Sequence, residues 1–281
     1  MRRRKNLIIW LVVLVAIIGG GIFSLVHKRT QQSKTVTVGV VGISNQDEKI
    51  WDQVKKTAKD KYGVTVQLKD FTDYNQPNKA LQNGDIDLNN FQHTAFLNAW
   101  NKANKGDLVS IGSTVIAPIR LYSEKYHKLN ELPQGATIAV PNDASNESRA
   151  LYVLKNAGLI TFKKGTGKLA TIADIDKNPK ELKIKELGAE QTARSLKDVD
   201  AAVVNNTYAI PAKLGDKQTI YVEPLNKDSE QWINVFAANK KDKNNQAYKD
   251  VVKSYQTKEV KRLLHKYYGN KEVTAWDIKL K

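Results

Sequence analysis

Strand-like and helix-like segments alternate along most of this 281-residue chain, and this alternation restricts the fold more than any other feature of the sequence. Val36, Val38 and Val40 alternate with polar or small residues, which is typical of a strand. Apolar side chains then recur at helical spacing in 46–61, and a second alternating segment, 64–71, follows. We therefore predict α/β sheets whose ligand sites lie at the carboxyl ends of strands.

The same two periodicities predict the remaining elements. Further strands are expected near 85–89, 108–111, 115–121, 137–140, 182–186, 201–204, 220–222 and 232–238. Helices are expected at 75–81, 95–103, 146–157, 190–196, 208–213, 246–256 and 258–267. Pro118 and Pro224 stand where the chain is expected to cross between two lobes.

An apolar run, 7–26, follows the basic residues 2–5 at the N-terminus. A helix of about 20 residues spans about 30 Å, the thickness of a hydrocarbon core, and its basic flank is expected to stay cytoplasmic. We favour a retained signal-anchor over a cleaved signal peptide, because the run is long and no small-x-small site follows it. Residues 1–34 are thus interpreted as a basic cytoplasmic end, a transmembrane signal-anchor and a tether. The chain has no cysteine, which excludes anchoring through a lipidated cysteine.

The formal net charge of +16 raises the possibility of binding to nucleic acid or another polyanion. Seven of the 45 basic residues lie within 1–34 and all 29 acidic residues lie beyond, so the exported part carries only +9. Its lysines are dispersed, which favours a solvated surface and no nucleic-acid partner. The absence of cysteine, and of any two histidines at i, i+4 spacing, argues against a metal site, and we expect no cofactor.

Polar and aromatic side chains gather just after several predicted strands, where an open α/β fold presents its loops to ligand. The segment 73–78 contains Tyr74 among polar neighbours. The segment 89–93 combines amides with the ring of Phe91 and the imidazole of His93. Turn chemistry is the alternative explanation, because Asn and Asp favour turns and helix caps.

A third cluster, 141–149, joins a predicted strand to the start of a helix. Free backbone N–H groups at a helix start attract an anion, and the planar fork of Arg149 can hold a carboxylate through two hydrogen bonds. A surface salt bridge along the helix is the alternative. The segment 205–208 follows an apolar strand, and Asn234 lies in another, where either a ligand amino group or neighbouring backbone would satisfy its amide.

Together these groups suit a zwitterion better than a reaction. Arginine suits a carboxylate, amide oxygens suit an ammonium group, and rings suit an apolar side chain. The chain has no G-x-S-x-G elbow, no G-x-x-x-x-G-K-[ST] loop and no G-x-G-x-x-G motif. We therefore predict a binding protein without catalytic residues, not an enzyme.

Five segments together resemble the methionine-binding, NlpA-type substrate-binding proteins of ABC importers: FTDYNQPNKAL, GDIDLNNFQHTAFL, IAVPNDASNESRAL, NPKELKIKELGAEQTARSL and AAVVNNTYA. Their order and spacing extend the resemblance over nearly all of 36–276. It implies a type II periplasmic-binding-protein-like fold with a ligand cleft between two lobes that close about a hinge. Lobe 1 would comprise 35–118 and 225–281, and lobe 2 would comprise 119–224.

Carried over by position, the resemblance implies seven ligand-binding residues: Tyr74, Phe91, His93, Asn146, Arg149, Asn205 and Asn234. The first three would line the lobe 1 side of the cleft. Asn146 and Arg149 would hold the ligand carboxylate. Asn205 and Asn234 would bind polar ligand atoms.

The predicted function is extracytoplasmic binding of methionine or a close relative, anchored on the cell membrane by a single-pass helix. The implied partners are the permease and ATPase subunits of an ABC importer. Ala117 and Asn90 depart from the family pattern, which is often aromatic at the first position and usually apolar at the second. L- or D-methionine, another hydrophobic amino acid and a methionine-containing dipeptide are therefore all considered as ligands. A membrane-anchored enzyme or sensor domain on the same scaffold is the alternative function.

Overall fold

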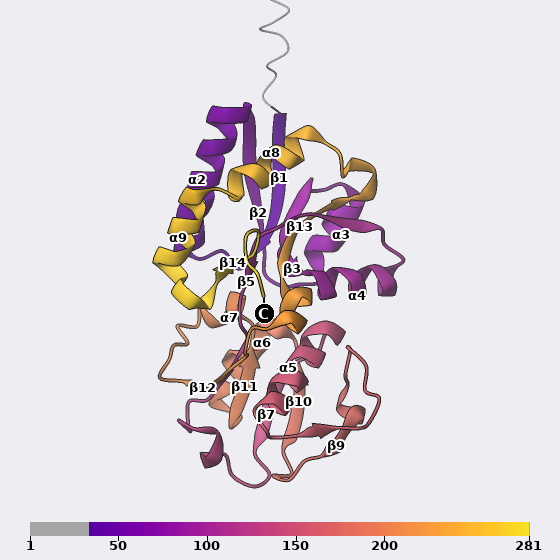
Figure 1. Cartoon of the computed structure of the whole chain (residues 1–281), viewed down its shortest axis with the longest axis vertical. Coiled ribbons are helices and arrows are strands. Elements are labelled where there is room, and N and C mark those ends of the chain that lie inside the picture. Colours follow the sequence, from indigo (N-terminus) through magenta and orange to yellow (C-terminus); the bar gives the residue numbers. More distant parts are fainter. Residues whose placement is uncertain (1–33, 281) are drawn as a thin grey trace, which may run out of the picture.

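The computed structural model describes residues 34–280, which form two five-stranded sheets flanked by helices (Figure 1). The predicted membrane segment 7–26 and its flanks lie outside these residues. Within 34–280, no helix combines the length and the apolar character needed to cross a membrane.

The first sheet occupies the upper half of Figure 1 and mixes parallel with antiparallel pairs. Its strands are β1 (Lys34–Val41), β2 (Val64–Phe71), β3 (Leu88–His93), β4 (Leu108–Ser113) and β13 (Asn234–Asn239). Their order is β2-β1-β3-β13-β4. β1 runs parallel to β2 and β3, whereas β13 runs antiparallel to β3 and β4. The chain therefore returns to the first sheet after it has built the second.

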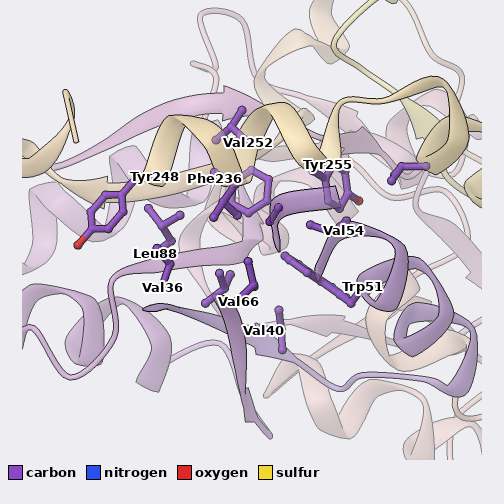
Figure 2. Close-up of a cluster of buried hydrophobic side chains, with 14 of the residues drawn as sticks. Val36, Val40, Trp51, Val54, Val66, Leu88, Phe236, Tyr248, Val252 and Tyr255 are labelled. Carbon is purple, nitrogen blue, oxygen red and sulfur yellow. The ribbon is translucent and has the colours of Figure 1, made fainter. Parts of the chain in front are cut away.

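Five helices accompany this sheet in the upper half of Figure 1: α2 (Asn45–Tyr62), α3 (Gln76–Asn83), α4 (Thr94–Asn104), α8 (Gln246–Tyr255) and α9 (Lys258–Tyr268). Ser44 and Asp47 form a capping box at the start of α2, and Gly63 ends that helix in the left-handed region at φ 66°. Figure 2 shows the core beneath α2 and α8, where the rings of Trp51, Phe236 and Tyr255 pack with centroids 5.4–6.1 Å apart.

The second sheet occupies the lower half of Figure 1 and has the strand order β10-β7-β11-β6-β12. Its strands are β6 (Arg120–Tyr122), β7 (Thr137–Pro141), β10 (Lys183–Leu187), β11 (Ala201–Val204) and β12 (Thr219–Val222). β7, β10 and β11 are parallel, and β6 is antiparallel to β11 and β12. The helix α5 (Ala144–Asn156) packs Leu151 and Leu154 against the aliphatic core of this sheet.

Shorter elements complete the described part of the chain. They are β5 (Val115–Ile116), β8 (Thr161–Phe162), β9 (Ile175–Lys177), β14 (Val273–Thr274), α6 (Ala189–Thr192) and α7 (Asn206–Ala209). The 3-10 turns are η1 (Leu129–Glu131), η2 (Ile172–Asp174), η3 (Arg194–Lys197), η4 (Lys227–Trp232), η5 (Lys240–Asp242) and η6 (Gly269–Lys271).

Two strand predictions were wrong in instructive ways. The predicted strand 115–121 is two strands, β5 and β6, because the chain crosses between the sheets at 117–119, where Pro118 has no N–H to donate to a ladder. The predicted strand 85–89 is displaced to β3. Asp87 belongs to the preceding turn, where its carboxylate accepts hydrogen bonds from the Thr37 N–H and the Tyr248 hydroxyl.

Candidate ligand-binding site

A cavity that is partly open to solvent lies where elements of the two sheets meet. All seven residues predicted to bind ligand line this cavity: Tyr74, Phe91, His93, Asn146, Arg149, Asn205 and Asn234. The structure thus brings together positions that are up to 160 residues apart in the sequence.

Arg149 projects from α5 and is only 4% exposed. Its Nε and Nη2 donate to the two carboxylate oxygens of Glu223 at 2.9 and 2.5 Å, and Nη2 also donates to the Ala117 carbonyl at 2.9 Å. The salt bridge is therefore buried and bidentate, unlike the surface pair considered above. The Nε and Nη2 atoms of the guanidinium are therefore already hydrogen-bonded to other protein groups. Within residues 34–280, Nη1 is the guanidinium nitrogen without a protein acceptor.

Glu223 also connects the two crossings between the sheets. Its Oε2 accepts a hydrogen bond from the Ile119 N–H at 3.1 Å, and its own N–H donates to the Ile119 carbonyl at 3.0 Å. Trp232 covers the arginine, with Cζ of Arg149 5.0 Å from the ring centroid. The guanidinium is thus fixed by an ion pair, by hydrogen bonds and by a cation–π contact.

His93 is neutral and has a defined tautomer. Burial, reinforced by the positive charge of Arg149, lowers its pKa to about 3. Its Nδ1 accepts a hydrogen bond from the Phe96 N–H at the start of α4, so the ring proton is on Nε2. Nε2 then donates to Oδ1 of Asn146 at 3.2 Å, across the boundary between the two sheets.

This hydrogen bond continues into the amide of Asn205. Asn146 Oδ1 accepts from Asn205 Nδ2 at 2.8 Å, while Asn146 Nδ2 donates to the Asp143 carboxylate at 2.8 Å. Each amide is therefore oriented by its partners. Asn205 Oδ1 is buried and has no partner among the described residues, although it belongs to a side chain that lines the cavity. A buried acceptor of this kind needs a donor, and a ligand is a ready source of one.

The start of α5 is not the open anion site that the sequence suggested. Asp143 caps this helix, and its Oδ1 accepts from the Asn146 N–H at 3.0 Å. One of the N–H groups expected to attract a ligand anion is therefore satisfied by the protein's own carboxylate. Within the cavity, Arg149 supplies the positive charge for an anion.

Aromatic rings line another part of the cavity. The centroids of Tyr74, Phe91 and Phe96 lie 5.7–5.9 Å from one another. Tyr208 packs 5.1 Å from Tyr74 and comes from the other half of the molecule. Burial raises the pKa of Tyr74, so its hydroxyl stays protonated and this wall carries no charge. Such a surface suits an apolar side chain.

Buried amides beneath this wall hold β3 in place. Asn78 Oδ1 accepts from Asn89 Nδ2 and Gln92 Nε2 at 2.9 and 2.6 Å, and Asn78 Nδ2 donates to Gln92 Oε1 at 2.8 Å. The network brackets Phe91 and fixes the strand that carries both Phe91 and His93. Reasoning from the sequence missed this network, because a run of Asn and Gln residues is compatible both with an exposed turn and with buried, hydrogen-bonded amides.

Asn234 and Glu272 lie at the margin of the cavity, which adjoins a second pocket that they also line. Glu272 Oε1 accepts from Asn206 Nδ2 at 2.7 Å, a second contact between the two halves. Burial, with a further contribution from Asp47, raises the pKa of Glu272 to about 8. Asn234 stands opposite His93 in the ladder between β3 and β13, and its backbone carbonyl accepts from the Thr114 N–H.

Reasoning from the sequence missed Phe96 and Glu272, which line the cavity, and Glu223 and Trp232, which contact Arg149. The fixed counter-ion Glu223 had one available signal, because an acidic residue stands directly before Pro224 at the predicted crossing. Phe96 and Trp232 were assigned to neighbouring elements by their apolar character. No group of three or more histidine and carboxylate side chains within residues 34–280 is arranged to hold a metal ion.

Comparison with known proteins agrees with this geometry. The family model described as NlpA lipoprotein matches residues 36–276. The D-methionine-binding lipoprotein MetQ of Escherichia coli K12 is 41% identical over 248 residues, which are 86% of this chain and 88% of that protein. The substrate-binding protein of a methionine transporter from Streptococcus pneumoniae is 46% identical, with a TM-score of 0.81 over 86% of this chain and 96% of that one. A nutrient-binding protein from Burkholderia cenocepacia, solved bound to methionine, is 45% identical, with a TM-score of 0.80 over 85% and 99%. The chain belongs to the NlpA lipoprotein family.

Proposed function

We propose that this protein is an extracytoplasmic substrate-binding protein that captures methionine or a closely related amino acid for an ABC importer. The observation that carries the proposal is the shared cavity of Arg149 and Asn205, which contains a fixed cation, an unpartnered buried amide oxygen and a group of aromatic rings. A free amino acid supplies a carboxylate for the first and ammonium donors for the second. The D-methionine-binding name of one relative and the methionine bound to another support this choice.

In this proposal each side of the cavity has a separate task. Arg149 receives the ligand carboxylate through Nη1, with Asn146 beside it, and Asn205 Oδ1 accepts from the ammonium group. Tyr74 and Phe91 pack against the methionine side chain. His93 holds Asn146 in its orientation, and Asn234 contacts polar ligand atoms at the margin.

We further propose that the two sheets define the two lobes of a type II binding-protein fold. Residues 35–118 and 225–281 would form lobe 1, and 119–224 would form lobe 2, with the crossings around Ile119 and Glu223 as the hinge. The contacts from His93 to Asn146 and from Asn206 to Glu272 join the proposed lobes, as expected for a closed arrangement. Ligand between the lobes would stabilise this arrangement.

Binding without catalysis is part of the proposal. Both ring nitrogens of His93 are engaged in hydrogen bonds and its pKa is far below neutrality, so it is a poor general base. Permease and ATPase subunits of the importer would be the protein partners. Incubation of the purified protein with methionine should leave the amino acid chemically unchanged, and any turnover seen by mass spectrometry would revive the enzyme alternative.

We propose that the apolar run 7–26 holds the domain on the outer face of the cell membrane. Several relatives are named lipoproteins, whereas this chain has no cysteine to carry a lipid. Membrane fractionation would test this: the full chain should stay in the membrane pellet at alkaline pH, and a variant with three charged residues placed within 7–26 should not. Equal recovery of both in the soluble fraction would contradict an apolar anchor.

Isothermal titration of the purified protein tests the function itself. L- and D-methionine should each be titrated, with lysine and glutamate as controls whose side chains carry a charge. We expect saturable one-to-one binding of at least one methionine enantiomer and much weaker binding of both controls, because the ring wall offers no partner for a charged side chain. Absence of methionine binding would refute the proposal.

A further inference from the structure

The charges that line the cavity are few and nearly balanced. The ionisable side chains among its lining residues are Tyr74, His93, Arg149 and Glu272. Burial keeps Tyr74 and His93 neutral at pH 6.5, and the raised pKa of Glu272, about 8, keeps most of that carboxyl protonated. Arg149 is thus the one lining residue of 34–280 that carries a full charge at this pH, and Glu223 lies directly behind it.

Glu223 is placed to balance this charge. It is 8% exposed and meets Arg149 through both carboxylate oxygens. The backbone N–H of Ile119 fixes the same carboxylate from the hinge side. Asp143 is a further nearby anion, but it is hydrogen-bonded to Asn146 and does not line the cavity.

We propose that Glu223 determines ligand charge in this site: by neutralising Arg149, it makes the cavity select a ligand of zero net charge over a monoanion. The inference rests on the proposed function, because it assigns the charge selectivity of the same pocket. A ligand with only a carboxylate would be attracted by Arg149 and repelled by Glu223. A zwitterion also meets Asn205 Oδ1 with its ammonium group, so its own two charges offset the field of Glu223.

The expected effect is large enough to measure. A unit charge about 8 Å from a ligand charge, at an effective dielectric constant of about 20, changes an affinity by roughly thirtyfold. Loss of the Glu223 charge should therefore strengthen binding of a monoanion by about that factor. Binding of a zwitterion should change far less.

The test compares two ligands on three proteins at pH 6.5. The ligands are methionine and 4-(methylsulfanyl)butanoate, which keeps the side chain and the carboxylate but lacks the ammonium group. The proteins are the wild type, Glu223→Gln and Glu230→Gln. Glu230 is exposed on η4 and does not line the cavity, so its variant has the same change in net charge at a solvent-exposed position. Glu223→Gln preserves side-chain size and one acceptor for Arg149.

We expect the ratio of affinities, monoanion to methionine, to rise at least tenfold in Glu223→Gln and to be unchanged in Glu230→Gln. A smaller rise in a Glu223 variant that is folded by circular dichroism and binds methionine would overturn the inference. Glu223→Ala, which removes the charge without adding an amide donor, provides the same comparison if the glutamine variant does not fold.

The wild type supplies an independent criterion. It should bind the monoanion at least tenfold more weakly than methionine, and equal affinities would overturn the inference whatever the variants do. Failure of the wild type to bind methionine at all is a different result: it would refute the proposed function and remove this inference with it. Methionine binding with an unchanged ratio in the Glu223 variant would refute the charge selectivity alone.

Discussion

The two walls of the cavity differ in charge, in chemistry and in origin. The first, carried by the loop after β2, by β3 and by α4, presents the rings of Tyr74, Phe91 and Phe96. The second, carried by α5 and by the end of β11, presents Arg149 and Asn205. The neutral wall discriminates between ligands by the shape and apolar area of their side chains, whereas the polar wall discriminates by ligand charge and by the direction of hydrogen bonds. The difference indicates that side-chain selectivity and amino-acid recognition are separable in this protein.

The polar wall also carries the larger desolvation penalty. A buried ion pair gains stability only when its geometry is good and its remaining groups are satisfied, and Arg149 and Glu223 meet this condition through Ala117 and Ile119. The aromatic wall needs no such compensation. Substitutions in the two walls should therefore differ in how they affect stability and ligand binding.

Removal of the ion pair should give the largest effect on binding. In Arg149→Met/Glu223→Leu, two apolar side chains replace both charges, so no unpaired charge remains buried and the melting temperature should change little. Methionine binding should weaken by about 2–5 kcal/mol, because the ligand carboxylate loses its charged partner. Isothermal titration and thermal melting measure the two quantities.

The single variant Arg149→Met is the matched control for that design. It leaves Glu223 buried without its partner, which should destabilise the fold by roughly 3–5 kcal/mol. Unchanged methionine affinity in the double variant would contradict the assignment of Arg149 to the ligand carboxylate.

Truncation of the aromatic wall should give a smaller and more selective effect. Phe91→Ala removes apolar contact area, so methionine should bind more weakly by about 1–3 kcal/mol. When alanine is the ligand, its small side chain makes little contact with the rings, so the affinity for alanine should stay the same within error. Equal losses of affinity for methionine and for alanine, measured by titration, would show that the two walls do not act separately on the ligand side chain and on its amino-acid groups.

Among these substitutions, replacement of Glu272 at the contact between the two halves should change methionine binding least, and its effect should instead appear in the pH dependence of stability. Its pKa of about 8 in the folded protein lies above the ordinary 4.5 of a glutamic acid. The folded state therefore binds this proton more tightly, and the resulting stabilisation is full below about pH 4.5 and is lost as the pH rises to about 8. Glu272→Gln should remove that dependence.

Melting temperatures measured from pH 5 to 8, and at two higher pH values, test this expectation. The melting temperature of Glu272→Gln, relative to that of the wild type, should rise steadily across this range and level off above pH 8. The titration of His93 is common to both proteins and cancels in the difference. A difference that is constant with pH would contradict the raised pKa.

The alternation of strands and helices predicted most of the fold because local periodicity determines it. The strands 64–71 and 201–204 were predicted to the residue, and α2 to within one residue at each end, since Gly63 ends the helix by a local rule. The strand 115–121 was wrong because the path of the chain between two sheets is a tertiary property. The displaced β3 has the same cause, since Asp87 is held by Thr37 and Tyr248 from distant segments.

The sequence allowed prediction of residues that line the site, but not of the hydrogen bonds and the ion pair that connect them. The resemblance identified seven residues that the structure places around one cavity. It did not reveal that Glu223 occupies one edge of the Arg149 guanidinium, or that Asn146 links His93 to Asn205. Those relations depend on distances between segments 50 to 75 residues apart, which no local pattern encodes.

A crystal structure of the protein with bound methionine would test the central claim most directly. We predict the ligand in the cavity between the two sheets, with its carboxylate within hydrogen-bond distance of Arg149 Nη1, its ammonium group on Asn205 Oδ1 and its thioether against Tyr74 and Phe91. A ligand found outside this cavity, or bound with its ammonium group toward Arg149 and its carboxylate toward Asn205, would contradict the account.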